Sequence, residues 1–324
     1  MADTVAAMLV SASSPAPALR PGDPVAVVAP AGPSPPGDLS AGLALLASRY
    51  RVRPAENLFV REGYLAGSDE RRRGAVDRAL RDPDVRGVFC ARGGYGVQRI
   101  LPFLDRDALR SDPKPIVGFS DITALLCWAR AVGVVAIHGP VVTQLPRLPR
   151  ADLEHLFRLL EEPGYAPRLS GSGGNHSSRG PTLVSDSGAA EGPLVGGNLS
   201  LLGALAGCPW APLLDGAILV LEDVAEAPYR LDRLLTTLRH QVGARSADTL
   251  AGVAVGELSG CVPGEAGGPS ALEVVATQVS APGRPVVSGF PIGHGNRNAA
   301  FPIGVRARLD PKARILTWEG GVVR

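Results

Sequence analysis

Apolar runs rich in β-branched residues alternate with helix-like segments through the first half of the chain. The first run, residues 24–30, is bounded by glycine and proline, a pattern typical of a buried strand. Similar runs follow at 85–90, 115–119 and 134–138. Strands that alternate with helices of about ten residues predict a parallel α/β sheet.

The predicted helices between these strands have identifiable ends. The clearest spans Asp69 to Arg81, where acidic residues occupy the first turn and Val76 and Leu80 are four positions apart. The pair Asp82-Pro83 then stops it. Further helices are expected at 39–49, 97–103, 122–131, 200–206 and 229–240.

A Gly/Ser-rich stretch at 170–190 interrupts this regularity and predicts a linker. After it come strands at 217–221 and 253–257 and a hairpin pairing 305–309 with 314–318. We therefore predict a flexible tail at 1–20, an N-terminal Rossmann-like domain at 21–169, the linker, and a smaller β-rich C-terminal domain at 191–324.

Composition narrows the possible functions. The 324 residues carry a formal net charge of +2, with 45% apolar and 20% charged residues. Such a chain can bury a core, and it has no electrostatic footprint for nucleic acid or an anionic membrane. Its four cysteines form no CxxC pair, no cluster has metal-ligand spacing, and no nucleotide-binding glycine motif appears. We therefore expect no cofactor and no metal. We also expect a cytoplasmic protein, because the N-terminus lacks the basic region of a secretory signal.

Ser120 and Asp121 lie where a predicted strand ends and a helix begins. In an open parallel sheet ligands bind at this end of the strands. A serine there could be a nucleophile, with the following amides stabilising an anion at the helix N-terminus. Ser120 or Asp121 could also merely cap the helix, because serine and aspartate are preferred caps, and the two interpretations are compatible.

A serine nucleophile needs a base and a carboxylate to orient it. His138 ends a predicted strand and His294 lies between two glycines in a loop, and spacing alone does not choose between them. Glu222 ends an apolar run, a position suited to a partly buried acid, although an ordinary charge at the end of a strand explains the same pattern. The remaining histidines are expected to be solvated, on polar helix faces or in the linker: His155, His176 and His240.

The turn Arg92-Gly93-Gly94-Tyr95-Gly96 follows another predicted strand. Its glycines permit positive φ angles and a close approach of the backbone to an oxyanion or carboxylate. An ordinary tight turn explains the same pattern.

Eight short motifs follow one another across nearly the whole chain. They are VVAPAG at 27–32, GYLAGSDER at 63–71, RGGYG at 92–96, GFSD at 118–121, HGP at 138–140, GGNL at 196–199, LED at 221–223 and GHG at 293–295. Each motif alone is weak, but eight in this order are specific. In this order they resemble the motifs of one family, the LD-carboxypeptidases, which are serine peptidases that trim murein peptides and have microcin-immunity peptidases as relatives.

The resemblance implies a triad in which Ser120 is the nucleophile, His294 the general base and Glu222 the residue that orients the imidazole. It implies an oxyanion hole made by the backbone N–H groups of Asp121 and Gly94. It also implies a Rossmann-like domain and a smaller β-rich domain with the active site between them, and a homodimer.

Such an enzyme would release terminal D-alanine from a murein tetrapeptide through an acyl-enzyme. A carboxypeptidase must recognise a free carboxylate, and Arg92 is our prediction for that role. One alternative is a microcin-type immunity peptidase that cuts a peptidyl-nucleotide toxin, although the stretch 207–212 and the chain length favour the murein branch. A second alternative is a two-domain protein that binds a sugar or nucleotide without catalysis.

Overall fold

The computed structural model describes residues 13–171, 187–264, 267–320 and 322–324. Contacts divide the chain into two compact units, which we describe separately. Unit 1 contains the described residues up to Tyr165, together with Ala300–Gly304 and the C-terminal end. Unit 2 contains Ala166–Ala299 and Val305–Gly320. The predicted domain boundaries differ from these units on the C-terminal side. Residues 300–304 and 322–324, which the sequence places in the second domain, belong to unit 1. Most of the predicted linker, 172–186, lies outside the described residues.

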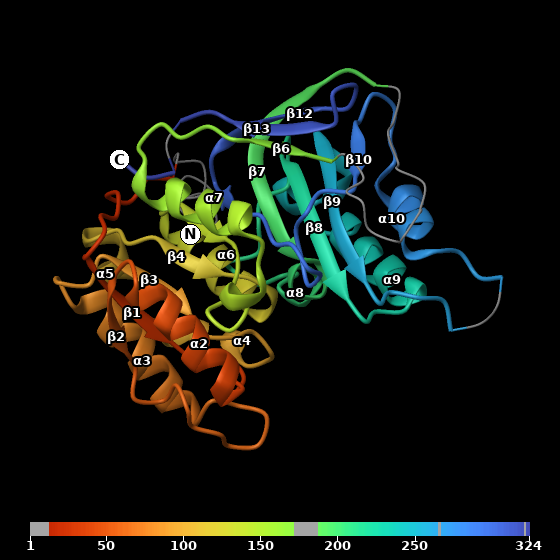
Figure 1. Cartoon of the computed structure of the whole chain (residues 1–324). Coiled ribbons are helices and arrows are strands. Elements are labelled where there is room, and N and C mark those ends of the chain that lie inside the picture. The colour runs from red at the N-terminus through yellow and green to blue at the C-terminus, as the bar shows by residue number, and fades with distance from the viewer. Residues whose placement is uncertain (1–12, 172–186, 265–266, 321) are drawn as a thin grey trace. The chain divides into compact units, whose positions relative to one another are not determined.

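Unit 1 is built on a six-stranded sheet in the order β11-β5-β4-β3-β1-β2. Strands β4, β3, β1 and β2 of this sheet are labelled in Figure 1. The first five strands of the chain pair in parallel, and β11 pairs with β5 antiparallel. This is the parallel α/β sheet that the alternating sequence pattern predicts, with a final strand added from far along the chain. The strands are β1 Pro24–Val28, β2 Arg51–Pro54, β3 Gly87–Cys90, β4 Ile116–Gly118, β5 Ala136–His138 and β11 Phe301–Ile303.

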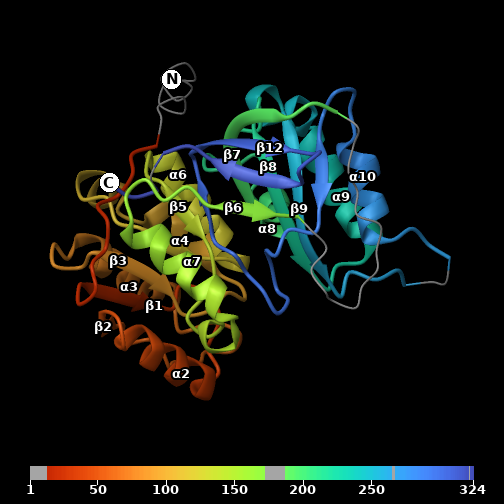
Figure 2. The ribbon, with the colours of Figure 1, turned by 45° about the horizontal axis from the view of Figure 1, so that its top comes forward.

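Helices connect these strands. The connections that lead from β2 to β5 run in one direction across the sheet, so right-handed crossovers place their helices on one face, where α5 contacts both α3 and α6. The crossover through α2 runs in the opposite direction. Helix α7 lies near α2 (Figure 2). Its Phe157 packs edge-on against Tyr50, which follows α2. The helices are α2 Pro36–Ala47, α3 Asp69–Arg81, α4 Val97–Ile100, α5 Arg106–Ser111, α6 Thr123–Val132 and α7 Arg150–Glu161, with short 3-10 helices at Leu101–Phe103, Ser120–Ile122 and Leu145–Arg147.

Helix α3 begins and ends where the sequence predicts. The Ser68 hydroxyl accepts a hydrogen bond from the Arg71 N–H at 3.3 Å and so caps the N-terminus. Asp69 and Glu70 in the first turn, and Arg78 and Arg81 in the last, complement the helix dipole.

The sequence places residues 1–20 in a flexible tail, of which 1–12 lie outside the described residues. The remainder contacts unit 1. Ser14 forms a bridge with Val134, Ala16 forms one with Val323, and the Leu19 side chain is buried. Residues 13–20 therefore belong to the folded unit rather than to a free tail.

Unit 2 contains a seven-stranded sheet in the order β10-β9-β8-β7-β12-β13-β6. Strands β7 to β10 pair in parallel, and β12, β13 and β6 continue the sheet antiparallel. Helix α9 packs between α8 and α10 beside the parallel strands (Figure 1). The elements are β6 Arg168–Ser170, β7 Ala190–Asn198, β8 Ile218–Val224, β9 Gly252–Ser259, β10 Val286–Ser288, β12 Arg306–Asp310, β13 Ile315–Trp318, α8 Leu199–Ala204, α9 Pro228–Arg239, α10 Ala271–Val279 and 3-10 helices Gly243–Arg245 and Ala247–Thr249.

Candidate active site

Ser120 lies at the carboxyl end of β4, at the first position of the 3-10 helix that leads into α6. Its φ angle is 62°, in the left-handed region that non-glycine residues seldom adopt. A residue held there costs roughly 1–3 kcal/mol, and such strain is concentrated at functional sites. The sharp turn from strand to helix resembles a nucleophile elbow, although the downstream glycine of that motif is missing.

The backbone of Gly93 lies directly against Ser120. A Cβ atom placed on Gly93 would be 2.8 Å from the Ser120 Cβ and 2.9 Å from its Oγ. The same atom would be 3.4 Å from the Asp121 nitrogen. Only glycine fits at this position, so the structure brings the predicted 92–96 turn and the predicted serine together. Gly94, with a φ angle of 115°, follows in the same turn.

The side chain of Asp121 is buried, and its Oδ2 accepts a hydrogen bond from the backbone N–H of Val97 at 3.0 Å. Burial raises the pKa of Asp121 to about 6, against the opposing effects of the Val97 hydrogen bond and the Arg72 charge. The sequence singles out the backbone N–H of this residue; the structure adds that its carboxylate joins the 3-10 helix to the start of α4.

Arg92 is half-buried, and its guanidinium donates a hydrogen bond to the Pro33 carbonyl oxygen at 2.6 Å. This contact holds the side chain near the segment that follows β1. Ser120, Asp121, Gly94 and Arg92 thus all lie at or beside the carboxyl ends of the strands of unit 1, where a ligand binds in an open parallel sheet.

In unit 2, Nδ1 of His294 lies 2.7 Å from Oε2 of Glu222. Glu222 is fully buried near the end of β8, whereas the His294 side chain is 20% exposed. Burial raises the pKa of Glu222, and the hydrogen bond and charge of His294 lower it. A buried acid that holds one nitrogen of a partly exposed imidazole fixes the ring's orientation and tautomer.

The loop that carries His294 passes close to two carboxylates. A Cβ on Gly293 would lie 3.1 Å from Oε2 of Glu222, and one on Gly295 would lie 1.6 Å from Oε2 of Glu257. The two glycines of the GHG motif therefore allow the backbone to approach where a side chain would collide. Sequence reasoning missed Glu257, although it predicts the strand that this residue ends.

The GGN and LED motifs meet in the parallel pairing of β7 and β8, where Asn198 lies opposite Glu222. Asn198 Nδ2 donates to Oδ1 of Asp223 at 3.0 Å, and the N–H and hydroxyl of Ser200 each donate to Oδ2 of Asp223 at 2.8 Å. These contacts tie the start of α8 to the strand end that carries Glu222.

The two histidines between which the sequence alone could not choose lie in different units, His138 in unit 1 and His294 in unit 2. His138 is fully buried in unit 1, where its ring stacks on Phe301 with a centroid distance of 4.6 Å. The expectation that His155 is solvated is wrong. Its ring is buried, and its Nε2 lies 2.7 Å from the Ala300 carbonyl oxygen, because the returning segment 300–304 covers α7. His240 is exposed as predicted, and His176 lies outside the described residues.

Among the described residues, no helix combines the length and hydrophobicity that a membrane span requires. No group of three or more His, Cys, Asp or Glu side chains in that part of the chain is arranged to hold a metal ion.

Comparison with known proteins identifies both halves of the chain. Residues 25–139 match the LD-carboxypeptidase N-terminal domain, and residues 191–309 match the LD-carboxypeptidase C-terminal domain. The murein tetrapeptide carboxypeptidase of Pseudomonas aeruginosa is 37% identical over 76% of this chain and 80% of its own length. The structure of a muramoyltetrapeptide carboxypeptidase from Oxalobacter formigenes superposes with a TM-score of 0.76 at 30% identity, covering 92% of this chain and 98% of that one.

A second branch of relatives is also present. The microcin C7 self-immunity protein of Escherichia coli is 29% identical over 76% of this chain and 77% of its own length. A structure of a microcin C7 self-immunity protein has a TM-score of 0.83 at 23% identity, over 96% of this chain and 100% of that one, which shows a shared fold.

Fold and comparisons together define a peptidase. The chain belongs to the LD-carboxypeptidase family, as the order of its sequence motifs predicts.

Proposed function

We propose that this chain is a serine-type LD-carboxypeptidase that releases terminal D-alanine from murein tetrapeptides. The observation that carries the proposal is the hydrogen bond between buried Glu222 and His294. A second observation supports it, namely the left-handed backbone of Ser120 at a strand end. In this proposal Ser120 is the nucleophile, His294 the base and Glu222 the residue that orients the base.

The His294–Glu222 pair suits a general base. Ionised Glu222 can only accept a hydrogen bond, so the imidazole proton resides on Nδ1 and Nε2 keeps its lone pair. Nε2 is then ready to take a proton from a serine hydroxyl. The carboxylate also stabilises the imidazolium that forms when the proton moves.

The reaction proceeds in two stages. The Ser120 Oγ attacks the carbonyl carbon of the amide between the L-centre of the third residue and D-alanine, while His294 takes the hydroxyl proton. The tetrahedral intermediate collapses, the C–N bond breaks, and His294 returns the proton to the amine of D-alanine. A water molecule then attacks the ester carbonyl while His294 takes its proton. The second tetrahedral intermediate collapses, the ester C–O bond breaks, and His294 returns the proton to the Ser120 Oγ, which frees the tripeptide.

Charge develops on the carbonyl oxygen during both stages. In the proposal the N–H groups of Asp121 and Gly94 donate to this oxyanion. The close approach of Gly93 supports it, since a Cβ on that residue would lie 2.9 Å from the Ser120 Oγ and 3.4 Å from the Asp121 nitrogen. Arg92 is proposed to pair with the free carboxylate of D-alanine, although one of its N–H groups is already used by Pro33.

The decisive experiment measures D-alanine release from a murein tetrapeptide by the wild type and by Ser120→Ala. Release by the wild type alone, with labelling of Ser120 by a fluorophosphonate probe, supports the proposal. Equal release by both proteins overturns the mechanism. A peptidyl-adenylate assayed in parallel distinguishes the microcin-type activity. A wild type that cleaves neither substrate and is not labelled by the probe is the result expected of a non-catalytic binding protein.

We also propose a homodimer in the cytoplasm, in keeping with the family resemblance. Light scattering on the purified protein should give about twice the 33.5 kDa mass of one chain. Cell fractionation should recover the protein with cytoplasmic enzymes. A mass of one chain would contradict the first part, and recovery outside the cytoplasm the second.

A further inference from the structure

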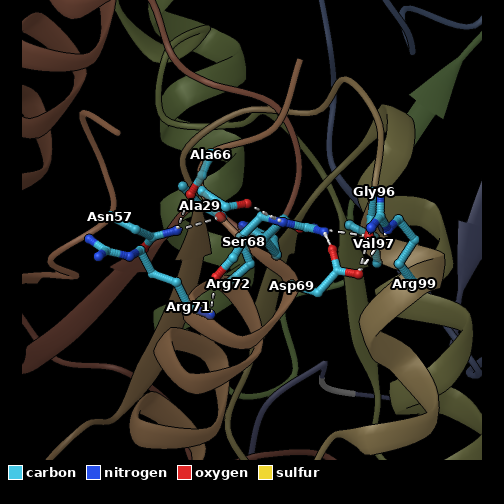
Figure 3. Close-up of polar contacts among 12 residues, drawn as sticks. Ala29, Asn57, Ala66, Ser68, Asp69, Arg71, Arg72, Gly96, Val97 and Arg99 are labelled. Carbon is cyan, nitrogen blue, oxygen red and sulfur yellow. Dashed lines mark hydrogen bonds and ion pairs between the residues drawn. The ribbon is translucent and has the colours of Figure 1, made fainter. Parts of the chain in front are cut away.

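One arginine of unit 1 is completely buried. Arg72, on helix α3, has no exposed surface and donates to the backbone carbonyls of Pro30, Gly67 and Gly96. Figure 3 shows its guanidinium beside Gly96 and Asp69. The distances are 3.2 Å from Nε to the Gly67 oxygen and 2.9 Å from Nη1 to the Gly96 oxygen. Its Nη2 forms an ion pair with Asp69. Burying a charge is costly unless it is paired and hydrogen-bonded, so each of these contacts offsets that cost.

The three carbonyls belong to different loops. Pro30 follows β1, Gly96 follows β3, and Gly67 ends the segment that leads into α3. Because β1 and β3 are neighbours in the sheet, a single guanidinium joins the loops at the carboxyl ends of two adjacent strands. The next strand, β4, leads to Ser120.

The loop that Arg72 holds at Gly96 also reaches the serine. Its Gly93 end lies against Ser120, and at its other end the Val97 N–H donates to the Asp121 carboxylate. Gly96 has a φ angle of 119°, and a Cβ there would be 2.9 Å from Nη1 of Arg72, so this contact requires glycine.

Asp69 extends the network to helix α4. It accepts hydrogen bonds from Arg72 and, through Oδ2, from Nε of Arg99 at 2.9 Å (Figure 3). The start of α4 is therefore held from α3 at both Gly96 and Arg99. Arg72 is also the charged group that opposes the rise which burial causes in the pKa of Asp121.

We propose that Arg72 is a positioning residue for the nucleophile: it fixes the turn 93–97, and through that turn the placement of Ser120 and Asp121. The inference rests on the proposed role of Ser120. A purely structural arginine would affect stability and leave the turnover of the folded enzyme unchanged. A positioning residue affects kcat and the reactivity of Ser120 at temperatures where the variant is fully folded.

The test compares Arg72→Met and Arg72→Lys with the wild type in D-alanine release and in the rate of fluorophosphonate labelling. A misplaced nucleophile is expected to lower kcat and the labelling rate of Arg72→Met by about 10- to 100-fold, while KM changes little. Arg72→Lys keeps the charge but not the fork of donors, so it should recover part of the loss. The matched control is Arg78→Met, on the same helix, whose side chain is 62% exposed and pairs only loosely with Glu56 at 4.0 Å. It should behave as the wild type.

Amide hydrogen exchange adds a local readout. The Val97 amide, which donates to Asp121, should exchange faster in Arg72→Met and in Arg72→Lys than in the wild type. If Arg72→Met does not fold, Arg72→Lys decides: a folded lysine variant with reduced kcat and faster Val97 exchange supports the inference.

Failure of the inference is distinct from failure of the proposed function. An active wild type labelled at Ser120, with Arg72 variants that keep its kcat and labelling rate, overturns only the role of Arg72. A wild type that neither releases D-alanine nor reacts at Ser120 overturns both.

Discussion

His294 Nδ1 lies 2.7 Å from Glu222 Oε2, although 72 residues separate the two in sequence. The side chain of Glu222 is fully buried, whereas that of His294 is 20% exposed. The pair has the acid-to-imidazole geometry that a general base requires.

Glu222→Gln should lower kcat by about 10²- to 10⁴-fold with little loss of fold. The amide preserves the shape of the side chain, but its NH₂ group can donate to Nδ1 and so favour the wrong tautomer of His294. Steady-state D-alanine release checks this. Glu191→Gln, at an exposed ion pair with Arg306 and Arg308, is the control and should keep wild-type kcat. Equal activity of Glu222→Gln and the wild type would remove Glu222 from the mechanism.

The two histidines left open by the sequence should respond differently to alanine. His294→Ala should abolish turnover while the melting temperature stays close to that of the wild type, because the ring is partly exposed. His138→Ala removes a fully buried ring stacked on Phe301, and should destabilise unit 1 while the folded protein keeps most of its kcat. Melting curves and activities of both variants check this, and the reverse pattern would reassign the base.

Gly93→Ala should inactivate the enzyme. The added Cβ would lie 2.8 Å from the Ser120 Cβ, closer than carbon atoms approach, and Ser120 is already strained, so the serine or the turn must move. We expect labelling of Ser120 by a fluorophosphonate to slow by about 100-fold. Gly37→Ala is the control because its Cβ meets nothing within 4 Å on helix α2. An unchanged labelling rate in Gly93→Ala would show that the turn at residue 93 does not control the reactivity of Ser120.

The sequence predicts local structure best where the signals are local. Helix α3 was delimited by the acidic first turn and by Asp82-Pro83, all within a few residues of its ends. The parallel sheet of unit 1 follows from the alternation of strands and helices along the chain. The positions of Ser120 and Glu222 at strand ends come from the same pattern.

Long-range contacts could not be predicted in this way. The pairing of β11 with β5 joins residues 301–303 to 136–138, and no local pattern indicates it. The same return of the chain buries His155, which explains the wrong prediction for that residue. Only the family resemblance distinguished His294 from His138, because the contact of His294 with Glu222 depends on the tertiary fold. The sequence does not distinguish Arg72 from the other arginines of α3. Its burial depends on loops that only the tertiary fold brings around it.

Asp121→Asn should change how stability depends on pH. Burial raises the pKa of Asp121 from its usual 3.8 to about 6. Between those pH values the folded protein keeps a proton that the unfolded chain has lost, so the free energy of unfolding falls as pH rises through this window. The difference in pKa corresponds to about 3 kcal/mol, fully lost above pH 6.

Asparagine cannot ionise, yet its amide oxygen still accepts from the Val97 N–H. Relative to the wild type, Asp121→Asn should therefore gain stability as pH is raised from about 4 to about 7, up to that amount. Urea unfolding at a series of pH values measures it, and effects of other groups cancel in the difference between the two proteins. Asp107→Asn, at an 82% exposed aspartate of α5, is the control. Parallel curves for wild type and Asp121→Asn would mean that the Asp121 carboxylate ionises in the folded protein as readily as in the unfolded chain.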